Sequence, residues 1–211
     1  MARTRTADKA YHHGDLRSAL LEAADGLLED RGVEAFTLRE CARRAGVSHA
    51  APAHHFKDVR SLLTAVAAGA FQRITASMRA CKAAASPDPL AQLQGAGEGY
   101  IAFALREPQH FYLMFRCSVV DTEDPELAAS GRGAFLELER PVAALHRVDD
   151  AMADDEGSID AVLLWSLVHG FAHLYLDGRL SQRADLDAAA LAERVIQRTL
   201  AALGANLPAG R

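Results

Sequence analysis

The stretch TLRECARRAGVSHAAPAHHF, residues 37–56, predicts two short helices joined by a tight turn. Thr37 and Glu40 fit a capping box, in which the hydroxyl and the carboxylate each satisfy a backbone N–H at the start of a helix. Gly46 permits the left-handed backbone that ends such a helix. Ser48 is then expected to cap a second helix over residues 49–55.

A helix, a tight turn and a second helix form the helix-turn-helix, whose second helix lies in the major groove of DNA. Leu38, Ala42, Val47 and Phe56 are expected to pack inward, which leaves small side chains and histidines facing outward. Alanine methyl groups can contact thymine methyl groups, and histidine can bond to a base edge or a phosphate. The residues expected to contact DNA are Thr37, Ser48, His49, Ala50, Ala53, His54, His55, Lys57 and Arg60.

The rest of the chain also predicts helices, so the expected fold class is all-α. Alanine and leucine dominate, β-branched residues are scattered, and no segment alternates as a strand would. Capping residues and helix-breaking prolines divide the chain into about nine helices. Their expected ranges are 15–31, 38–45, 49–55, 59–85, 89–106, 108–119, 125–147, 158–177 and 187–204.

Composition narrows the class of protein. Of the 211 residues, 50% are hydrophobic and 24% are charged, as is ordinary for a globular protein. No run of 18 or more apolar residues occurs, so no membrane span is expected, and the N-terminus lacks the apolar core of an export signal. The three cysteines are far apart and form no C-x-x-C pair, which favours the reducing cytoplasm.

The charge distribution points to one end of the chain. The net charge of −5 argues against a general nucleic-acid binder. The first 60 residues hold ten Lys and Arg against nine Asp and Glu, so the acidic excess lies in the remainder. A polyanion is therefore expected to meet the N-terminal end. Residues 1–13 predict a flexible basic arm, from which Arg3 and Arg5 are expected to enter a groove.

Two segments carry a family resemblance. The predicted helix 15–31, the stretch GVEAFTLRECARRAGVSHAAPAHHF at 32–56 and SLLTAV at 61–66 together resemble the N-terminal domain of TetR-family transcriptional regulators. Further along, WSLVHGFAHLYLDG at 165–178 resembles the Trp…His-Gly signature of the C-terminal domain in one subgroup. The resemblance implies a homodimer with a DNA-binding domain at 14–74 (helix-turn-helix at 37–56) and a regulatory and dimerisation domain at 75–211.

The chain departs from the family pattern at two positions. The family usually has Tyr where Ala53 stands and Lys where Val59 stands, and both side chains often contact a phosphate. Their loss is expected to weaken the anchoring to the DNA backbone. His54, His55, Lys57 and Arg60 are candidates to compensate. An alternative function is therefore a helical dimer whose DNA binding is weakened.

The middle of the chain collects many of its larger apolar side chains, with Phe111 to Phe115 almost continuous. Residues so close in sequence cannot share one face of a helix, so some are expected to line a cavity and others to pack in the core. An apolar pocket suits a lipophilic small molecule. The residues assigned to the pocket are Tyr100, Phe103, Phe111, Tyr112, Met114, Phe115, Phe135, Trp165 and His169.

The last two predicted helices are candidates for a four-helix seam between two copies of the chain. The seam is expected to use Ile159, Val162, Trp165 and Leu176 from the first helix, and Leu191, Val195 and Leu203 from the second. A two-fold dimer places two recognition helices about 34 Å apart, so a near-palindromic operator is expected. The family resemblance implies repression that a small-molecule effector relieves.

His169 and His173 support a rival interpretation, a metal-dependent sensor or enzyme. Four residues apart on a helix, they share a face and have metal-ligand spacing. A zinc-protease motif would need Glu after the first histidine, where Gly170 stands instead. The sequence also lacks a G-x-S-x-G nucleophile motif and a glycine-rich phosphate loop. We therefore expect no enzymatic activity, no cofactor and no bound metal.

Overall fold

The computed structural model describes residues 13–116, 118–150, 155–180 and 187–206, and its elements are helices, as the predicted all-α fold class requires. No strand occurs within those ranges. In chain order the elements are α1 (His13–Arg31), the 3-10 helix η1 (Val33–Ala35), α2 (Leu38–Arg44), the 3-10 helix η2 (Ala51–His54), α3 (Val59–Ala84), α4 (Pro89–Arg106), α5 (Pro108–Met114), α6 (Pro125–His146), α7 (Asp155–Leu176) and α8 (Ala188–Asn206).

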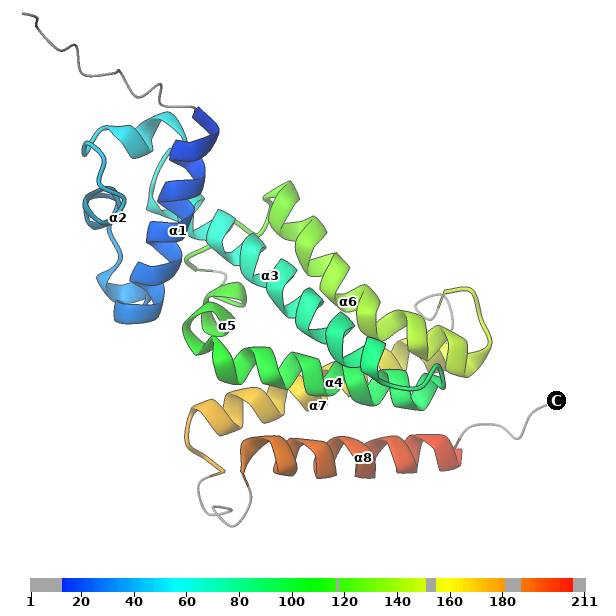
Figure 1. Cartoon of the computed structure of the whole chain (residues 1–211). Helices are drawn as coiled ribbons and strands as arrows, with labels where there is room; N and C mark the ends of the chain where they lie inside the picture. The colour runs from blue at the N-terminus through cyan, green and yellow to red at the C-terminus, as the bar shows by residue number, and fades with distance from the viewer. Residues whose placement is uncertain (1–12, 117, 151–154, 181–186, 207–211) are drawn as a thin grey trace, which may run out of the picture.

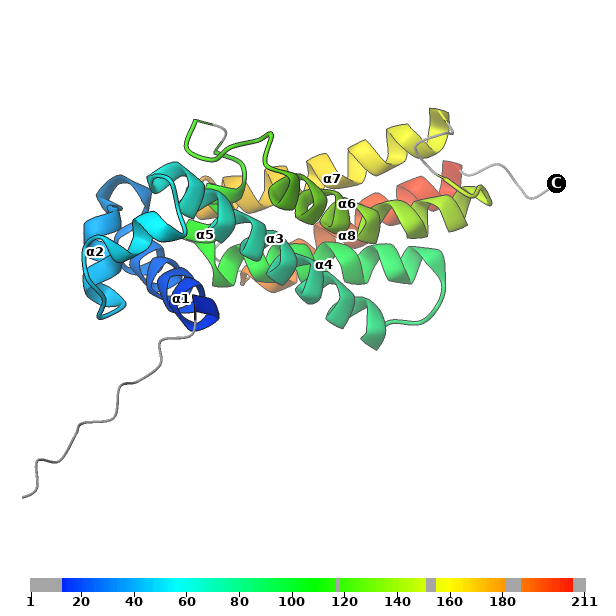
Figure 2. The ribbon, with the colours of Figure 1, turned by 90° about the horizontal axis from the view of Figure 1, so that it is seen from above.

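A small head stands at one end of an elongated body (Figure 1). The head contains α1, α2, η2 and the start of α3, which surround a core that includes Leu20, Leu28 and Phe56. The body contains α4 to α8 and the rest of α3, around a second core that includes Ile74 and Phe103. Seen from above, the body helices extend away from the head (Figure 2), which leaves α2 and η2 at the far end of the molecule.

The helix α3 runs through both cores. Its first part, including Leu62 and Val66, packs in the head, whereas Ala70, Ile74 and Met78 pack in the body. The proposed domain boundary at 74/75 therefore falls inside one continuous helix. A displacement of this helix in the body must reach the head, because no flexible linker interrupts it.

The second helix of the predicted helix-turn-helix differs from expectation. Residues 51–54 form a short 3-10 helix instead of an α-helix over 49–55. Pro52 supplies the reason, because it lacks the N–H that would bond to the Ser48 carbonyl in an α-helix. The Ala51 N–H bonds to that carbonyl instead, over 3.0 Å. Ser48 makes no side-chain cap for this helix.

Side-chain caps occur at the N-termini of α2 and α3. The Thr37 hydroxyl accepts a bond from the Glu40 N–H, as predicted, but the Glu40 carboxylate pairs with Arg43 and does not complete the capping box. Asp58 caps α3 and forms a full capping box with Ser61. Gly46 has the expected positive φ of 70°, which ends the α2 segment. The helix predicted at 108–119 is shorter, because α5 ends at Met114.

Two helices of the body cross closely at a glycine. A Cβ at Gly99 of α4 would lie 2.6 Å from the Met78 Cα and from the Ser77 carbonyl oxygen of α3. No larger residue fits without moving backbone, so Gly99 fixes how closely α3 and α4 approach.

One helix of the described ranges, α7, is long and apolar enough to cross a membrane by length and composition. This test is weak, because a core helix of a folded body meets it equally well. Here Ala161, Leu164, Val168 and Phe171 of α7 are buried in the body core, but only 28% of its apolar stretch is buried, and other apolar residues of this helix are exposed.

Candidate functional site

The outer surface of the head carries the residues that the sequence assigned to DNA. Ser48, His49, Ala50, Ala53, His54, Lys57 and Thr37 are exposed, and His55 is half-buried. Val47 and Leu38 are partly buried against the head core, and Ala42 and Phe56 are fully buried. The inward and outward faces therefore lie as the sequence indicated, although the backbone between them is a 3-10 helix.

Two of the assigned residues also have structural roles. The Thr37 hydroxyl caps α2. The Arg60 guanidinium donates to the Val120 carbonyl oxygen over 2.8 Å, so it ties the head to the segment before α6. Arg3 and Arg5 lie outside the described residues. The exposed face thus presents mainly histidines, small side chains and Lys57, a surface that can approach a polyanion closely.

A cavity of about 580 Å³ lies in the body and is lined by residues of α3, α4, α6, α7 and α8, and by Phe115, which follows α5. Its walls are predominantly aliphatic and aromatic. They are formed by Phe71, Ile74 and Met78 of α3, Leu93, Ala96, Gly97 and Tyr100 of α4, Phe115, Gly131, Arg132, Ala134, Phe135 and Leu138 of α6 and the segment before it, Val162, Leu164, Trp165, Leu167 and Val168 of α7, and Ile196 and Leu200 of α8. Volume and lining are those of a small-molecule site.

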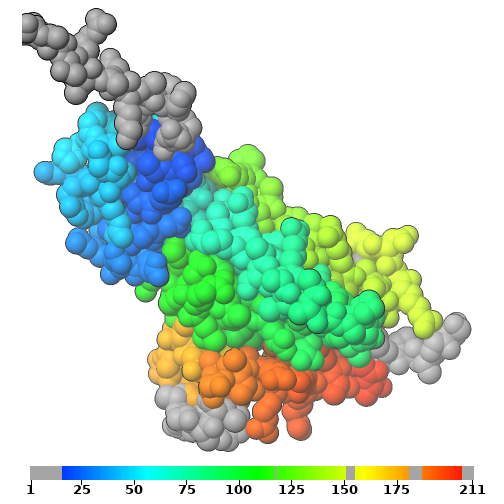
Figure 3. All heavy atoms as spheres, viewed as in Figure 1, coloured from blue at the N-terminus to red at the C-terminus, as the bar shows by residue number. Residues whose placement is uncertain are grey.

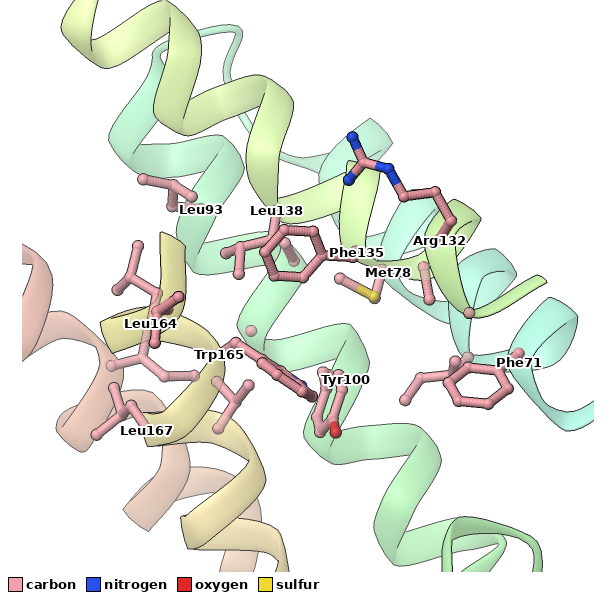
Figure 4. Close-up of a pocket in the computed structure, with 18 of the residues that line it drawn as sticks. Phe71, Met78, Leu93, Tyr100, Arg132, Phe135, Leu138, Leu164, Trp165 and Leu167 are labelled. Carbon is pink, nitrogen blue, oxygen red and sulfur yellow. The ribbon is translucent and has the colours of Figure 1, made fainter. Parts of the chain in front are cut away.

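A hydrogen bond joins Tyr100 of the cavity wall to His169. The Tyr100 hydroxyl lies 2.9 Å from Nδ1 of His169, and the Trp165 side chain lies close to that hydroxyl. Tyr100 and Trp165 lie side by side in the cavity wall (Figure 4). Burial raises the pKa of Tyr100, and burial together with nearby His173 lowers the pKa of His169. All three groups are therefore uncharged near neutral pH.

A cation lies at the edge of the same cavity. The Arg132 guanidinium lies over the Phe135 ring, 5.8 Å from its centroid, and is turned away from Tyr100 and Trp165 (Figure 4). Both of its terminal nitrogens donate to the carboxylate of Glu139, two turns further along α6. This pairing raises the pKa of Arg132, and Asp150 contributes in the same direction.

Four of the nine residues that the sequence assigned to the pocket line this cavity: Tyr100, Phe115, Phe135 and Trp165. The other five do not. Phe103, Phe111 and Met114 pack in the body core, and Tyr112 donates to Asp177 over 2.6 Å. His169 lies behind Tyr100. Three of these five residues, Phe111, Tyr112 and Met114, lie on α5, which contributes no residue to the cavity wall.

The sequence reasoning missed the wall that α3 provides. Phe71, Ile74 and Met78 follow each other at helical spacing, so the face was readable from the sequence. Nothing local distinguishes such a face from ordinary core, which is why it was not assigned. The contributions of α8 depend on how that helix packs against α4 and could not be read from the sequence.

The two histidines of the rival interpretation lie within an aromatic cluster. Their ring centroids are 4.6 Å apart, and Phe115 lies 4.5 Å from His169. Phe111 and Tyr112 surround His173. Within the part of the chain that the structure describes, no group of three or more His, Cys, Asp or Glu residues has metal-site geometry.

Polar contacts join α5 to the head. Nε2 of buried His110 lies 2.8 Å from the Asp25 carboxylate of α1. Arg73 of α3 donates both to Asp25 and to Glu107, which precedes α5. Leu113 of α5 belongs to the head core, whereas its neighbours Phe111 and Met114 belong to the body core. The short helix α5 therefore contacts both the head and the aromatic cluster beside the cavity.

One face of α7 is apolar and exposed. Ile159 is 61% exposed, Leu163 48%, and Val162, Trp165 and Leu174 are also exposed. A contiguous apolar face of this kind is typical of an interface. Helix α8 differs from expectation, because Leu203 is buried in the body core and Leu191, Val195 and also Leu176 of α7 pack against that core. Leu203 cannot supply a dimer seam from that position.

Comparisons with known proteins give two family matches. The domain described as "Tetracyclin repressor-like, C-terminal domain" matches residues 93–199, just over half of the chain. The domain described as "Bacterial regulatory proteins, tetR family" matches residues 20–66. Among curated proteins, no relative matches.

Solved structures with the same fold cover nearly the whole chain. A protein of unknown function from Rhodococcus sp. RHA1 is 29% identical with a TM-score of 0.76, and the match covers 95% of this chain and 99% of that one. The TetR family transcriptional regulator PfmR from Thermus thermophilus is 18% identical with a TM-score of 0.60, covering 92% and 98%. The fatty acid degradation regulator FadR from Bacillus halodurans is 13% identical with a TM-score of 0.65, covering 91% and 98%. The last two show the fold alone.

Proposed function

The chain belongs to the TetR family of bacterial transcriptional regulators, and from this membership we propose that it represses transcription as a homodimer on a near-palindromic operator. A lipophilic small molecule that enters the body cavity releases the operator. The protein acts in the cytoplasm and catalyses no reaction. The observation that carries this proposal is the apolar cavity of about 580 Å³ behind a head with helix-turn-helix order.

The DNA-contacting surface is the exposed side of the head. His49, Ala50, Ala53 and His54 reach the base edges, while Lys57 and the arm residues Arg3 and Arg5 contact phosphates. The short 3-10 helix brings small side chains close to the groove. The absence of the family's usual Tyr and Lys at Ala53 and Val59 reduces phosphate contacts, so the affinity for DNA is lower and falls less steeply as the salt concentration rises.

Signal transfer follows the continuous helix α3 and the short helix α5. An effector against Phe71, Tyr100 and Phe115 displaces side chains that pack on both helices. Because α3 enters the head without interruption, and α5 holds Asp25 of α1 through His110, that displacement changes the separation of the two heads in a dimer. A coupling of about 1–3 kcal/mol is typical of such regulators.

The dimer interface is the exposed apolar face of α7, with Ile159, Val162, Leu163 and Trp165 at its centre. Val162 and Trp165 also line the cavity, so the seam and the mouth of the cavity share residues. A second subunit on this face would border the effector.

Selection of DNA from a random pool tests the proposal. Fragments retained by the purified full chain should share a near-palindromic site, and a gel shift with that site should be reversed by a lipophilic compound that enters the cavity. A dimer that retains no fragment even at low salt would instead support the alternative of a helical dimer without operator binding, and the repressor function would be wrong.

A further inference from the structure

The cavity wall narrows the chemical class of the effector; this inference rests on the proposed function, because it takes the cavity as the effector site. Among the described residues that line the cavity, Arg132 is the one with a formal charge, and none is acidic. An ion that enters such a space loses its hydration and needs a fixed partner there. Whether Arg132 is available to pair with a ligand therefore decides whether an anionic effector can bind.

Arg132 is already engaged. Its two terminal nitrogens donate to the two oxygens of Glu139, whose side chain is only 6% exposed. Asp150 adds a second negative charge close to the guanidinium. An anionic ligand that captured Arg132 would leave the Glu139 carboxylate buried without its cation, which is strongly unfavourable. The edge of the cavity thus attracts anions poorly, although it contains an arginine.

Tyr100 offers the other polar contact. Its hydroxyl is hydrogen-bonded to Nδ1 of His169, and the residue as a whole is 5% exposed. A neutral histidine exists in two tautomers, so the Tyr100 hydroxyl can either donate to or accept from a ligand. The remaining wall near it is apolar, including Phe115 and Val168.

We propose that the effector is an uncharged, predominantly apolar molecule with one hydrogen-bonding group, a hydroxyl or a carbonyl, that contacts the Tyr100 hydroxyl. Carboxylic acids and amines of the same skeleton are excluded. Arg132 lies over the Phe135 ring at the edge of the cavity, and its charge is neutralised by Glu139. It therefore does not bind the carboxylate of an acidic ligand.

Trp165 fluorescence can report ligand binding, because Trp165 is the single tryptophan of the chain and lines the cavity. Its fluorescence is titrated in the full-length protein at pH 7.5 with 1-decanol, decanoate and decylamine, which share one skeleton. Decanol is expected to bind at least about tenfold more tightly than either ion. Tyr100→Phe should weaken decanol binding by about tenfold, because it removes the hydroxyl that forms a hydrogen bond with the ligand.

The Glu139→Gln variant tests why decanoate binds weakly. The cause is either that Arg132 is already paired with Glu139 or that decanoate is less hydrophobic than decanol. Without the carboxylate Arg132 is free, so decanoate should bind at least about tenfold more tightly than to the unmodified protein, while decanol changes little. Glu137→Gln is the matched control, because Glu137 is buried on the same helix but pairs with Arg79 and Lys82. It should leave both affinities unchanged. Circular dichroism checks that both variants fold, and if Glu139→Gln unfolds, the comparison of the three probes in the unmodified protein decides.

The outcomes are distinguishable. Decanoate binding as tightly as decanol in the unmodified protein overturns the effector class and leaves the cavity as the effector site. An unchanged decanoate affinity in folded Glu139→Gln also overturns the role given to Arg132 and Glu139. If no probe alters Trp165 fluorescence, both the class and the proposed effector site are wrong.

Discussion

At the scale of single residues, His169 links the cavity to the aromatic cluster around α5. It accepts from or donates to Tyr100 and packs edge-on against Phe115, 4.5 Å between ring centroids. Burial first, and His173 second, lower the pKa of His169 below its usual value near 6.5. The folded protein therefore stabilises the neutral form of the His169 ring.

This lowered pKa predicts a pH dependence of stability. In the unfolded chain His169 titrates near pH 6.5, whereas the folded protein keeps it neutral to lower pH, so the unfolded state binds more protons as the pH falls. Its contribution to stability is therefore complete above pH 6.5 and is lost as the pH falls towards the folded pKa. The melting temperature should decline less between about pH 7.5 and about pH 5.5 in His169→Gln than in the unmodified protein. Equal declines would contradict this assignment.

Lys57 and Arg60 are both basic, exposed and close in sequence to the 3-10 helix η2, yet their substitution should have different effects. Lys57→Ala should weaken operator binding at every sequence and reduce the slope of affinity against salt by about 1, without changing the melting temperature. Arg60→Ala should cost about 1 kcal/mol of stability, because its guanidinium donates to the Val120 carbonyl oxygen. Thermal unfolding and gel shifts at several salt concentrations measure both effects. A Lys57→Ala protein with a lowered melting temperature would show that the side chain is structural.

At the scale of the elements, the head depends on how its helices start. Thr37 caps α2 by accepting from the Glu40 N–H over 3.1 Å, whereas Ser48 caps no helix with its side chain. The two hydroxyl residues look equivalent in the sequence. Only one of them satisfies a backbone group of a helix, because Pro52 makes the second segment a 3-10 helix.

Alanine substitutions separate these two roles. Thr37→Ala should lower the free energy of unfolding by about 1 kcal/mol, the usual loss of an N-cap. Ser48→Ala should change it by less than about 0.5 kcal/mol, as expected for an exposed residue without a structural contact. Urea denaturation of both variants gives the values. If Ser48→Ala destabilises as much as Thr37→Ala, the segment caps differently from the arrangement described above.

At the scale of the whole molecule, the head and the body each have their own core along one long helix. On the face shown in Figure 3, the head, coloured blue to cyan, lies at one end of the body. The body holds its cavity among five helices, and the exposed face of α7 borders it. Residues Val162 and Trp165 belong to both. The proposed dimer seam and the proposed effector site are adjoining surfaces, so dimer formation and effector binding should influence each other.

The apolar face of α7 predicts a dimer that one charge can break. Leu163→Asp would bury a carboxylate without a partner in the seam, which is strongly unfavourable, and should convert the dimer to a monomer. Ala201→Asp is the matched control, because it introduces the same charge on the exposed side of α8. Light scattering during gel filtration gives the mass of each variant. A dimeric Leu163→Asp protein, or a monomeric Ala201→Asp protein, would place the seam elsewhere.

Much of this protein was determined by its sequence alone. Helical spacing of apolar residues, the caps at Thr37 and Asp58, and the positive φ of Gly46 are local properties, because each depends on hydrogen bonds or steric limits within a few residues. They were enough to predict an all-α chain with a helix-turn-helix near its start. The exposed and buried faces of residues 47–56 follow from the same local pattern.

Tertiary structure alone decided the cavity. Phe111 and Phe115 are similar aromatic residues four positions apart, yet Phe111 fills the core and Phe115 lines the cavity. The pairing of Arg132 with Glu139 likewise depends on the space that surrounds α6. These features arise where five helices meet, and the meeting is fixed by close approaches such as that at Gly99, where a Cβ would lie 2.6 Å from the backbone of α3. A cavity is a property of the distances between helices, and those distances come from packing that no local segment encodes.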